Sequence, residues 1–233
     1  MKNLAISLKT HEMIIGWSYF AFQLLGLGTV AQLINGLLGY PLSHTQLNVA
    51  LFFVNFAAVV VIFHQYLFAN LKCFFSRFGK NMALTALGFG LYYGLNQATN
   101  IFIYLLDPSY GNANDAAIHQ MLTESFGLMF IATVLLVPLT EEVLYRGLLF
   151  GSLYRINKLL GLFLSMSLFS MIHILPYIGT YDPLHLLLSF FVYLPPGFAF
   201  AWVYVSTDSI FASTFLHMLI NGISILIMRF LYA

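Results

Sequence analysis

Three charged residues stand inside an apolar stretch of the chain, in the segment TEEVLYRG, where Glu141 and Glu142 precede Arg146. A charged side chain at the centre of a bilayer costs at least roughly 2.5–3.5 kcal/mol, so this cluster needs a structural or a chemical reason. On a helix, Glu142 and Arg146 stand at positions i and i+4 and can form an ion pair, while Glu141 points about 100° away. The guanidinium favours the charged form of Glu142, and Glu141 remains the candidate base toward water. The structural alternative is an ion pair that only holds neighbouring helices together.

Two further pairs of polar and aromatic residues follow at the same helical spacing. Phe169 and His173 stand at i and i+4, and so do His217 and Asn221. A lone histidine on an apolar helix is more often a packing residue than a catalyst, so neither pair indicates a site by itself. Together with the glutamates they supply what peptide hydrolysis needs, namely a base, an imidazole and amide or imidazole donors for an oxyanion.

The elements that carry these residues are apolar helices. The chain has 233 residues, of which 61% are hydrophobic and 7% charged, against about 25% charged in a soluble domain. Apolar runs long enough to cross a hydrocarbon core of roughly 30 Å recur along the whole sequence. We predict an all-α, polytopic transmembrane bundle of about seven spans (six to eight), with the active site enclosed by the C-terminal helices. The spans are expected at 13–36, 47–69, 82–106, 125–150, 159–178, 184–205 and 210–231.

The spacing of charges along the chain predicts how the helices lie relative to the membrane. Apart from Arg146 within a span and Arg229 near the opposite end, lysines and arginines fall at one set of helix ends, which favours a cytoplasmic N-terminus. Glu141 lies 14 residues before Arg155 and His173 lies 15 residues after Lys158, so both are roughly 21–22 Å from the same basic turn. His217 lies only about 9 Å into its span by the same rise. Either the turn before that span is sunk into the protein or the predicted boundary is wrong.

The three motifs EExxxR, FxxxH and HxxxN, in this order on successive helices, resemble those of the CPBP family of CAAX proteases and bacteriocin-processing proteins, also called Abi. The resemblance covers a catalytic core at residues 125–231 of a single transmembrane domain, 1–233. It implies an intramembrane endopeptidase of the CAAX prenyl protease 2 type. Glu141 and His173 would activate water, and His217 and Asn221 would stabilise the oxyanion. Glu142, Arg146 and Phe169 would support the site.

The resemblance and the composition also lead to expectations about cofactors and partners. We expect no cofactor; zinc, if present, would be bound by Glu141, His173 and His217, a set that we disfavour because no HExxH motif occurs. The expected partners are membrane lipids and a membrane-associated peptide or protein substrate, and the net charge of +1 argues against nucleic acid. We expect a multi-pass protein of a bacterial cell membrane that cleaves a pheromone- or bacteriocin-type peptide or a CAAX-like terminus. The alternatives are a non-proteolytic immunity or partner-binding protein and a small transporter, which only Pro195 and Pro196 favour.

Overall fold

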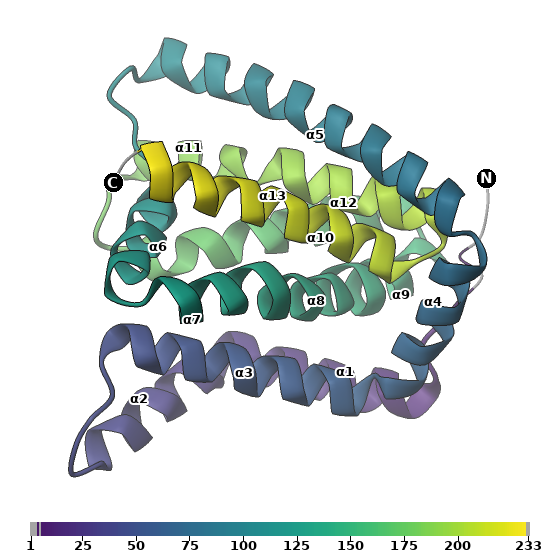
Figure 1. Ribbon diagram of the computed structural model, residues 1–233, viewed down its shortest axis with the longest axis horizontal. Helices are drawn as coiled ribbons and strands as arrows, with labels where there is room; N and C mark the ends of the chain where they lie inside the picture. The colour runs from purple at the N-terminus through teal and green to yellow at the C-terminus, as the bar shows by residue number, and fades with distance from the viewer. Residues whose placement is uncertain (1–3, 5, 232–233) are drawn as a thin grey trace.

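The apolar runs of the sequence fold into helices, because a helix satisfies its own backbone N–H and C=O groups where lipid offers no partners. The computed structural model describes residue 4 and residues 6–231, and Figure 1 shows their helices packed side by side along the long axis of the molecule. The α-helices are α1 (Thr10–Phe22), α2 (Gly28–Leu37), α3 (His44–Ile62), α4 (His64–Ser76), α5 (Phe78–Leu106), α6 (Ala113–Glu124), α7 (Phe126–Ile131), α8 (Val137–Glu141), α9 (Gly151–Tyr154), α10 (Lys158–Ile174), α11 (Pro183–Val192), α12 (Leu194–Thr207) and α13 (Ile210–Leu231). Wider π-helical segments at Gln23–Leu27, Ala132–Leu136 and Glu142–Phe150 join α1 to α2, α7 to α8 and α8 to α9, and a 3₁₀ turn at Leu175–Tyr177 follows α10.

Six stretches of the described residues are long and apolar enough to cross a membrane, so the chain is a multi-pass membrane protein. They are Thr10–Leu37, His44–Ile62, Phe126–Tyr154, Lys158–Tyr177, Pro183–Thr207 and Ile210–Phe230. The span expected at 82–106 is the 29-residue helix α5, which packs along α12 and α13 (Figure 1). Polar residues such as Asn96 and Asn100 leave α5 outside the six apolar stretches. The predicted polytopic helical fold is confirmed.

The stretch Phe126–Tyr154, which carries both glutamates, lies at the centre of the bundle. Helices α10, α12 and α13 pack against it, and more of it is buried than of the other five apolar stretches. Its π-helical parts have more residues per turn than an α-helix, an arrangement found mainly at functional sites. The bundle therefore surrounds the charged motif with protein on most sides.

The connection between α12 and α13 explains the depth of His217. Thr207, Asp208 and Ser209 are all buried, and the backbone N–H of Ile210 donates to Oδ1 of Asn70 on α4 at 3.0 Å. Helix α13 thus begins at Ile210, as predicted, but this first residue is buried in the protein. Of the two alternatives that the sequence left open, the burial of this turn favours a connection sunk into the protein.

The two ends of the bundle differ in charge. Helix α4 and the turn between α9 and α10, with Lys72, Arg155 and Lys158, lie at one end, while α6 and the start of α11 lie at the other (Figure 1). Asp182 caps α11 at that second end, where its side chain accepts from the N–H groups of Leu184 and His185. We call these the basic end and the acidic end. That the basic end faces the cytoplasm stays a prediction.

Candidate active site

Glu142 and Arg146 form an ion pair in the buried centre of the bundle. Both residues lie on the π-helical segment Glu142–Phe150, and Nη1 of Arg146 is 3.0 Å from Oε1 of Glu142. Both side chains are 0% exposed. The contact agrees with the i, i+4 spacing, and because the pair is buried, each charge depends on the other for compensation.

Aromatic rings and one carbonyl hold the guanidinium of Arg146 in place. The ring centroids of Phe169 and Phe200 lie 4.3 and 5.1 Å from its central carbon, and Nη2 donates to the carbonyl oxygen of Gly197 at 3.2 Å. Phe169, expected as a supporting residue, therefore contributes a cation–π contact. Phe200 and Gly197, both on α12, were not expected from the sequence.

Glu142 also accepts hydrogen bonds from helix α13. Oγ of Ser213 donates to Oε2 of Glu142, and Nδ1 of His217 lies 3.1 Å from Oε1. With Arg146, three donor groups surround one carboxylate, and both of its oxygens are contacted. Sequence reasoning missed Ser213, although its position four residues before His217 places both on one face of α13.

The imidazole of His217 lies between the two glutamates. A carboxylate can only accept, so the proton on Nδ1 of His217 is donated to Glu142, and Nε2 faces the other carboxylate. Nε2 lies 3.8 Å from Oε2 of Glu141, whose side chain is 14% exposed. Oε2 of Glu141 accepts no hydrogen bond from the described residues. Of the two acids, Glu141 is the one left available for chemistry.

His173 is linked through Phe169 to the group formed by Glu141, Glu142 and His217. Its Nδ1 lies 2.7 Å from the carbonyl oxygen of Phe169, which fixes the proton on Nδ1 and leaves Nε2 as a free acceptor. The ring of Phe169 contacts both imidazoles, with centroid distances of 4.8 Å to His173 and 5.9 Å to His217. The ring of Tyr193 stacks on that of His173, with 4.1 Å between centroids.

Asn221 stands one helical turn beyond His217, on the same face of α13. Its Nδ2 donates to the carbonyl oxygen of Thr133 at 3.0 Å, inside the π-helical segment Ala132–Leu136. One amide hydrogen of Asn221 thus joins α13 to the central stretch Phe126–Tyr154, and the second amide hydrogen remains available for another acceptor. The structure therefore brings Glu141, Glu142 and His217 into one cluster, with His173 and Asn221 at its edges.

The ligand set for zinc is not assembled in the described part of the chain. No group of three or more His, Cys, Asp or Glu side chains there converges as a metal site. Glu141, His173 and His217 are therefore not arranged as a three-ligand zinc centre. Independence from metal stays a prediction about the reaction.

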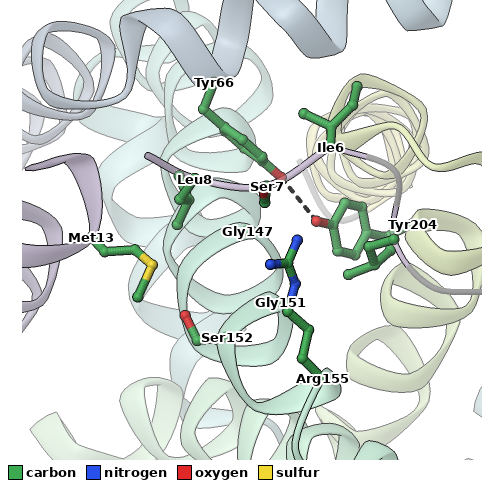
Figure 2. Close-up of a pocket in the computed structure, with 11 residues that line it drawn as sticks. Ile6, Ser7, Leu8, Met13, Tyr66, Gly147, Gly151, Ser152, Arg155 and Tyr204 are labelled. Atoms are coloured by element: carbon green, nitrogen blue, oxygen red, sulfur yellow. Dashed lines mark hydrogen bonds between the residues drawn. The ribbon is translucent and has the colours of Figure 1, made fainter. Parts of the chain in front are cut away.

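A separate pocket lies on the central helix nearer the basic end (Figure 2). It has a volume of about 120 Å³ and lies between Gly147, Gly151 and the N-terminal segment 6–8. The hydroxyls of Tyr66 and Tyr204 meet at 3.0 Å on one side of it, as the dashed line in Figure 2 marks. None of the predicted catalytic residues lines this pocket.

Comparison with known proteins finds similarity to membrane peptidases. Residues 123–223 match the family described as type II CAAX prenyl endopeptidase Rce1-like, and this segment contains all seven predicted site residues. A Bacillus subtilis protein described as "Putative membrane peptidase YdiL" is 30% identical over 125 residues, which are 53% of this chain and 46% of that protein. The chain thus covers about half the length of this curated relative. No solved structure matches.

Proposed function

We propose that this chain, whose residues 123–223 match the family described as type II CAAX prenyl endopeptidase Rce1-like, is an intramembrane endopeptidase. One observation carries the proposal. Three donors occupy Glu142, whereas Oε2 of Glu141 accepts no hydrogen bond and faces Nε2 of His217 at 3.8 Å. Two adjacent acids thus have separate roles, one as a structural anion and one as a base for water.

The charges of the cluster balance if Glu141 and His217 share one proton. With the proton on Glu141, the remaining charges are those of Glu142 and Arg146, which cancel. With the proton on Nε2 of His217, the imidazolium is stabilised by Glu142 and Glu141 becomes a carboxylate. The cluster is neutral in both states, so moving the proton within it creates no net buried charge. Glu142 then acts on His217 as the aspartate does on the histidine of a serine protease triad.

Hydrolysis follows from these positions. Glu141, as the carboxylate, takes a proton from water while the water oxygen attacks the carbonyl carbon of the peptide bond. Nε2–H of His217 and the second amide hydrogen of Asn221 stabilise the oxyanion that develops on the carbonyl oxygen. Nε2 of His173 accepts the other hydrogen of the water and orients it. When the carbon–nitrogen bond breaks, Glu141 returns its proton to the leaving amine.

The proposed substrate is a peptide or protein segment associated with the membrane. The cluster lies between apolar helices, so a soluble protein would have to insert a segment to reach Glu141. The family description, type II CAAX prenyl endopeptidase, suggests a substrate terminus that carries a lipid. The expectation from the sequence is a bacterial peptide of the pheromone or bacteriocin type.

The decisive experiment compares membrane peptides from cells that make the wild-type protein, Glu141→Gln, His173→Ala or the control Glu124→Gln. Glu124 is an exposed carboxylate at the end of α6, outside the cluster. Mass spectrometry should show one or more truncated peptides with the wild type and with Glu124→Gln. We expect Glu141→Gln to reduce their formation by roughly 10²–10⁴-fold, the usual contribution of a general base.

Equal peptide patterns in wild type and Glu141→Gln would refute the proposal. Protection of cells from a bacteriocin by Glu141→Gln as good as that by wild type would favour instead an immunity protein that does not cleave.

A further inference from the structure

Two contacts hold the imidazole of His173 in one orientation. The carbonyl oxygen of Phe169 accepts from Nδ1 at 2.7 Å, which sets the tautomer and the direction of Nε2. The ring of Tyr193 lies parallel to the imidazole, with 4.1 Å between centroids and 18° between planes. The hydrogen bond alone would let the ring swing about the Nδ1···O direction. The stacked tyrosine prevents that swing.

The ring of Tyr193 is itself held by the connection between α5 and α6. Its hydroxyl lies 3.2 Å from Nδ2 and 3.3 Å from Oδ1 of Asn112, so it can accept from the amide nitrogen and donate to the amide oxygen. Oδ1 of Asn112 also accepts from the N–H groups of Asn114 and Asp115, and thereby caps α6. One asparagine side chain therefore connects the start of α6 to the tyrosine on His173.

A second contact joins the same connection to α11, next to Tyr193. The hydroxyl of Tyr110 lies 3.0 Å from Oγ of Ser189, one helical turn before Tyr193. Tyr193 stands where α11 ends and α12 begins, at a break in the span Pro183–Thr207. At this break the ring of Tyr193 faces His173. Asn112 and Tyr110 hold the α5–α6 connection against the α11–α12 break.

We propose that Tyr193 is a positioning residue for His173. Through Asn112, the position of helix α6 at the acidic end then influences the orientation of that imidazole. The inference rests on the proposed function, because it gives His173 a task that depends on orientation. A reacting group displaced by about 1 Å can lose roughly 10²-fold in rate. A stacked ring that restricts His173 should thus influence turnover more than substrate binding.

The test compares Tyr193→Leu, which removes the plane, with Tyr193→Phe, which keeps the plane and loses the hydroxyl. The matched control is Tyr181→Leu, because Tyr181 stacks on His185 at 4.3 Å and 21°, outside the catalytic cluster. The first readout is the rate at which diethyl pyrocarbonate labels each histidine of the purified full-length protein, followed by mass spectrometry. It needs no substrate and reports on each imidazole separately.

We expect Tyr193→Leu to raise the labelling rate of His173 severalfold without changing that of His185. Tyr181→Leu should do the reverse, and Tyr193→Phe should raise the rate of His173 only slightly. An unchanged rate for His173 in Tyr193→Leu would overturn the proposal. If Tyr193→Leu does not fold, Tyr193→Ala, which also removes the plane, decides, and a rate for His173 equal to that of wild type then counts against the proposal.

The second readout is cleavage of two internally quenched peptides, one with a prenylated cysteine three residues before its C-terminus and one without the prenyl group. For a peptide that the wild type cleaves, Tyr193→Leu should lower kcat by roughly 10–100-fold with little change in KM. Tyr193→Phe should keep at least about a third of the wild-type kcat, since it loses only hydrogen bonds between neutral groups. A raised KM with unchanged kcat would mean that Tyr193 binds substrate instead.

The failure of this inference and of the proposed function can be told apart with Glu141→Gln. Persistent cleavage by Glu141→Gln refutes the peptidase mechanism. Loss of cleavage in Glu141→Gln, together with wild-type kcat in Tyr193→Leu, refutes only the positioning role of Tyr193.

Discussion

Replacing Glu142 by glutamine removes one buried charge and almost no volume. The glutamine oxygen can still accept from His217 and contact Arg146, which lie 3.1 and 3.0 Å from Oε1 of Glu142. The new amide nitrogen can donate to Ser213, whose single hydroxyl proton is then free to be donated to the carbonyl oxygen of Phe200, 3.0 Å away. The hydrogen-bonding pattern thus survives, and the loss is electrostatic. Arg146 remains fully buried without its counterion.

The cost of that loss can be estimated from the geometry. At an effective dielectric constant of 20, two unit charges about 4 Å apart attract by about 4 kcal/mol. Removing one partner of a buried ion pair typically costs about 3–5 kcal/mol. The contacts of Arg146 with Phe169, Phe200 and Gly197 persist and offset part of this cost. We therefore expect Glu142→Gln to lower the free energy of unfolding by about 3 kcal/mol.

The assay is equilibrium unfolding of the purified protein in mixed micelles, by titration with dodecyl sulfate and detection by circular dichroism. A double-mutant cycle with Arg146→Gln separates the pair from the rest of the site. The double variant contains no unpaired charge from this pair, so it should be more stable than the sum of the single effects predicts, by about 2 kcal/mol. Glu124→Gln, at an exposed position, should be close to wild type.

Two results would refute this reasoning. If Glu142→Gln unfolds within about 0.5 kcal/mol of wild type, as surface substitutions usually do, then Glu142 is not the anion that compensates Arg146. If the single effects simply add in the double variant, the two side chains are not coupled, and the contact seen between them contributes no net stability.

Two further predictions concern packing and metal. Gly88 on α5 faces α12 so closely that a Cβ would lie 2.2 Å from Cγ2 of Val203; Gly88→Ala should cost about 1–3 kcal/mol in the same unfolding assay. Gly94→Ala, where a Cβ meets nothing within 4 Å, should be neutral or stabilising, and equal effects at both sites would contradict the close contact. A strong chelator should leave peptide cleavage unchanged, since the described side chains form no three-ligand group; stoichiometric zinc that is lost together with activity would contradict this.

The amino-acid pattern is enough to predict the class of protein and the local pairs of site residues. A chain with 7% charged residues and recurring apolar runs has to bury its backbone in helices within a membrane. Spacing of i to i+4 is a local property of a helix, so the contact between Glu142 and Arg146 and the separate direction of Glu141 follow from it. The same local rule placed His173 one turn after Phe169 and Asn221 one turn after His217.

Which of these pairs meet depends on how the helices pack in three dimensions. Helical spacing determines the face and the rise of each residue, but not the offset between two helices, which depends on packing. The buried turn at 207–209, held by Asn70, lowers α13 into the bundle and brings His217 to the glutamates. Ser213 on the same helix completes the donors around Glu142.

The contact of Tyr193 with His173 has the same origin. It joins residues from α10, the α11–α12 break and the start of α6, and no period in the sequence relates them. Such contacts depend on where a helix breaks and on what packs against the break. The sequence could therefore supply the candidates for catalysis, and the packing of the helices decided their partners and their depth.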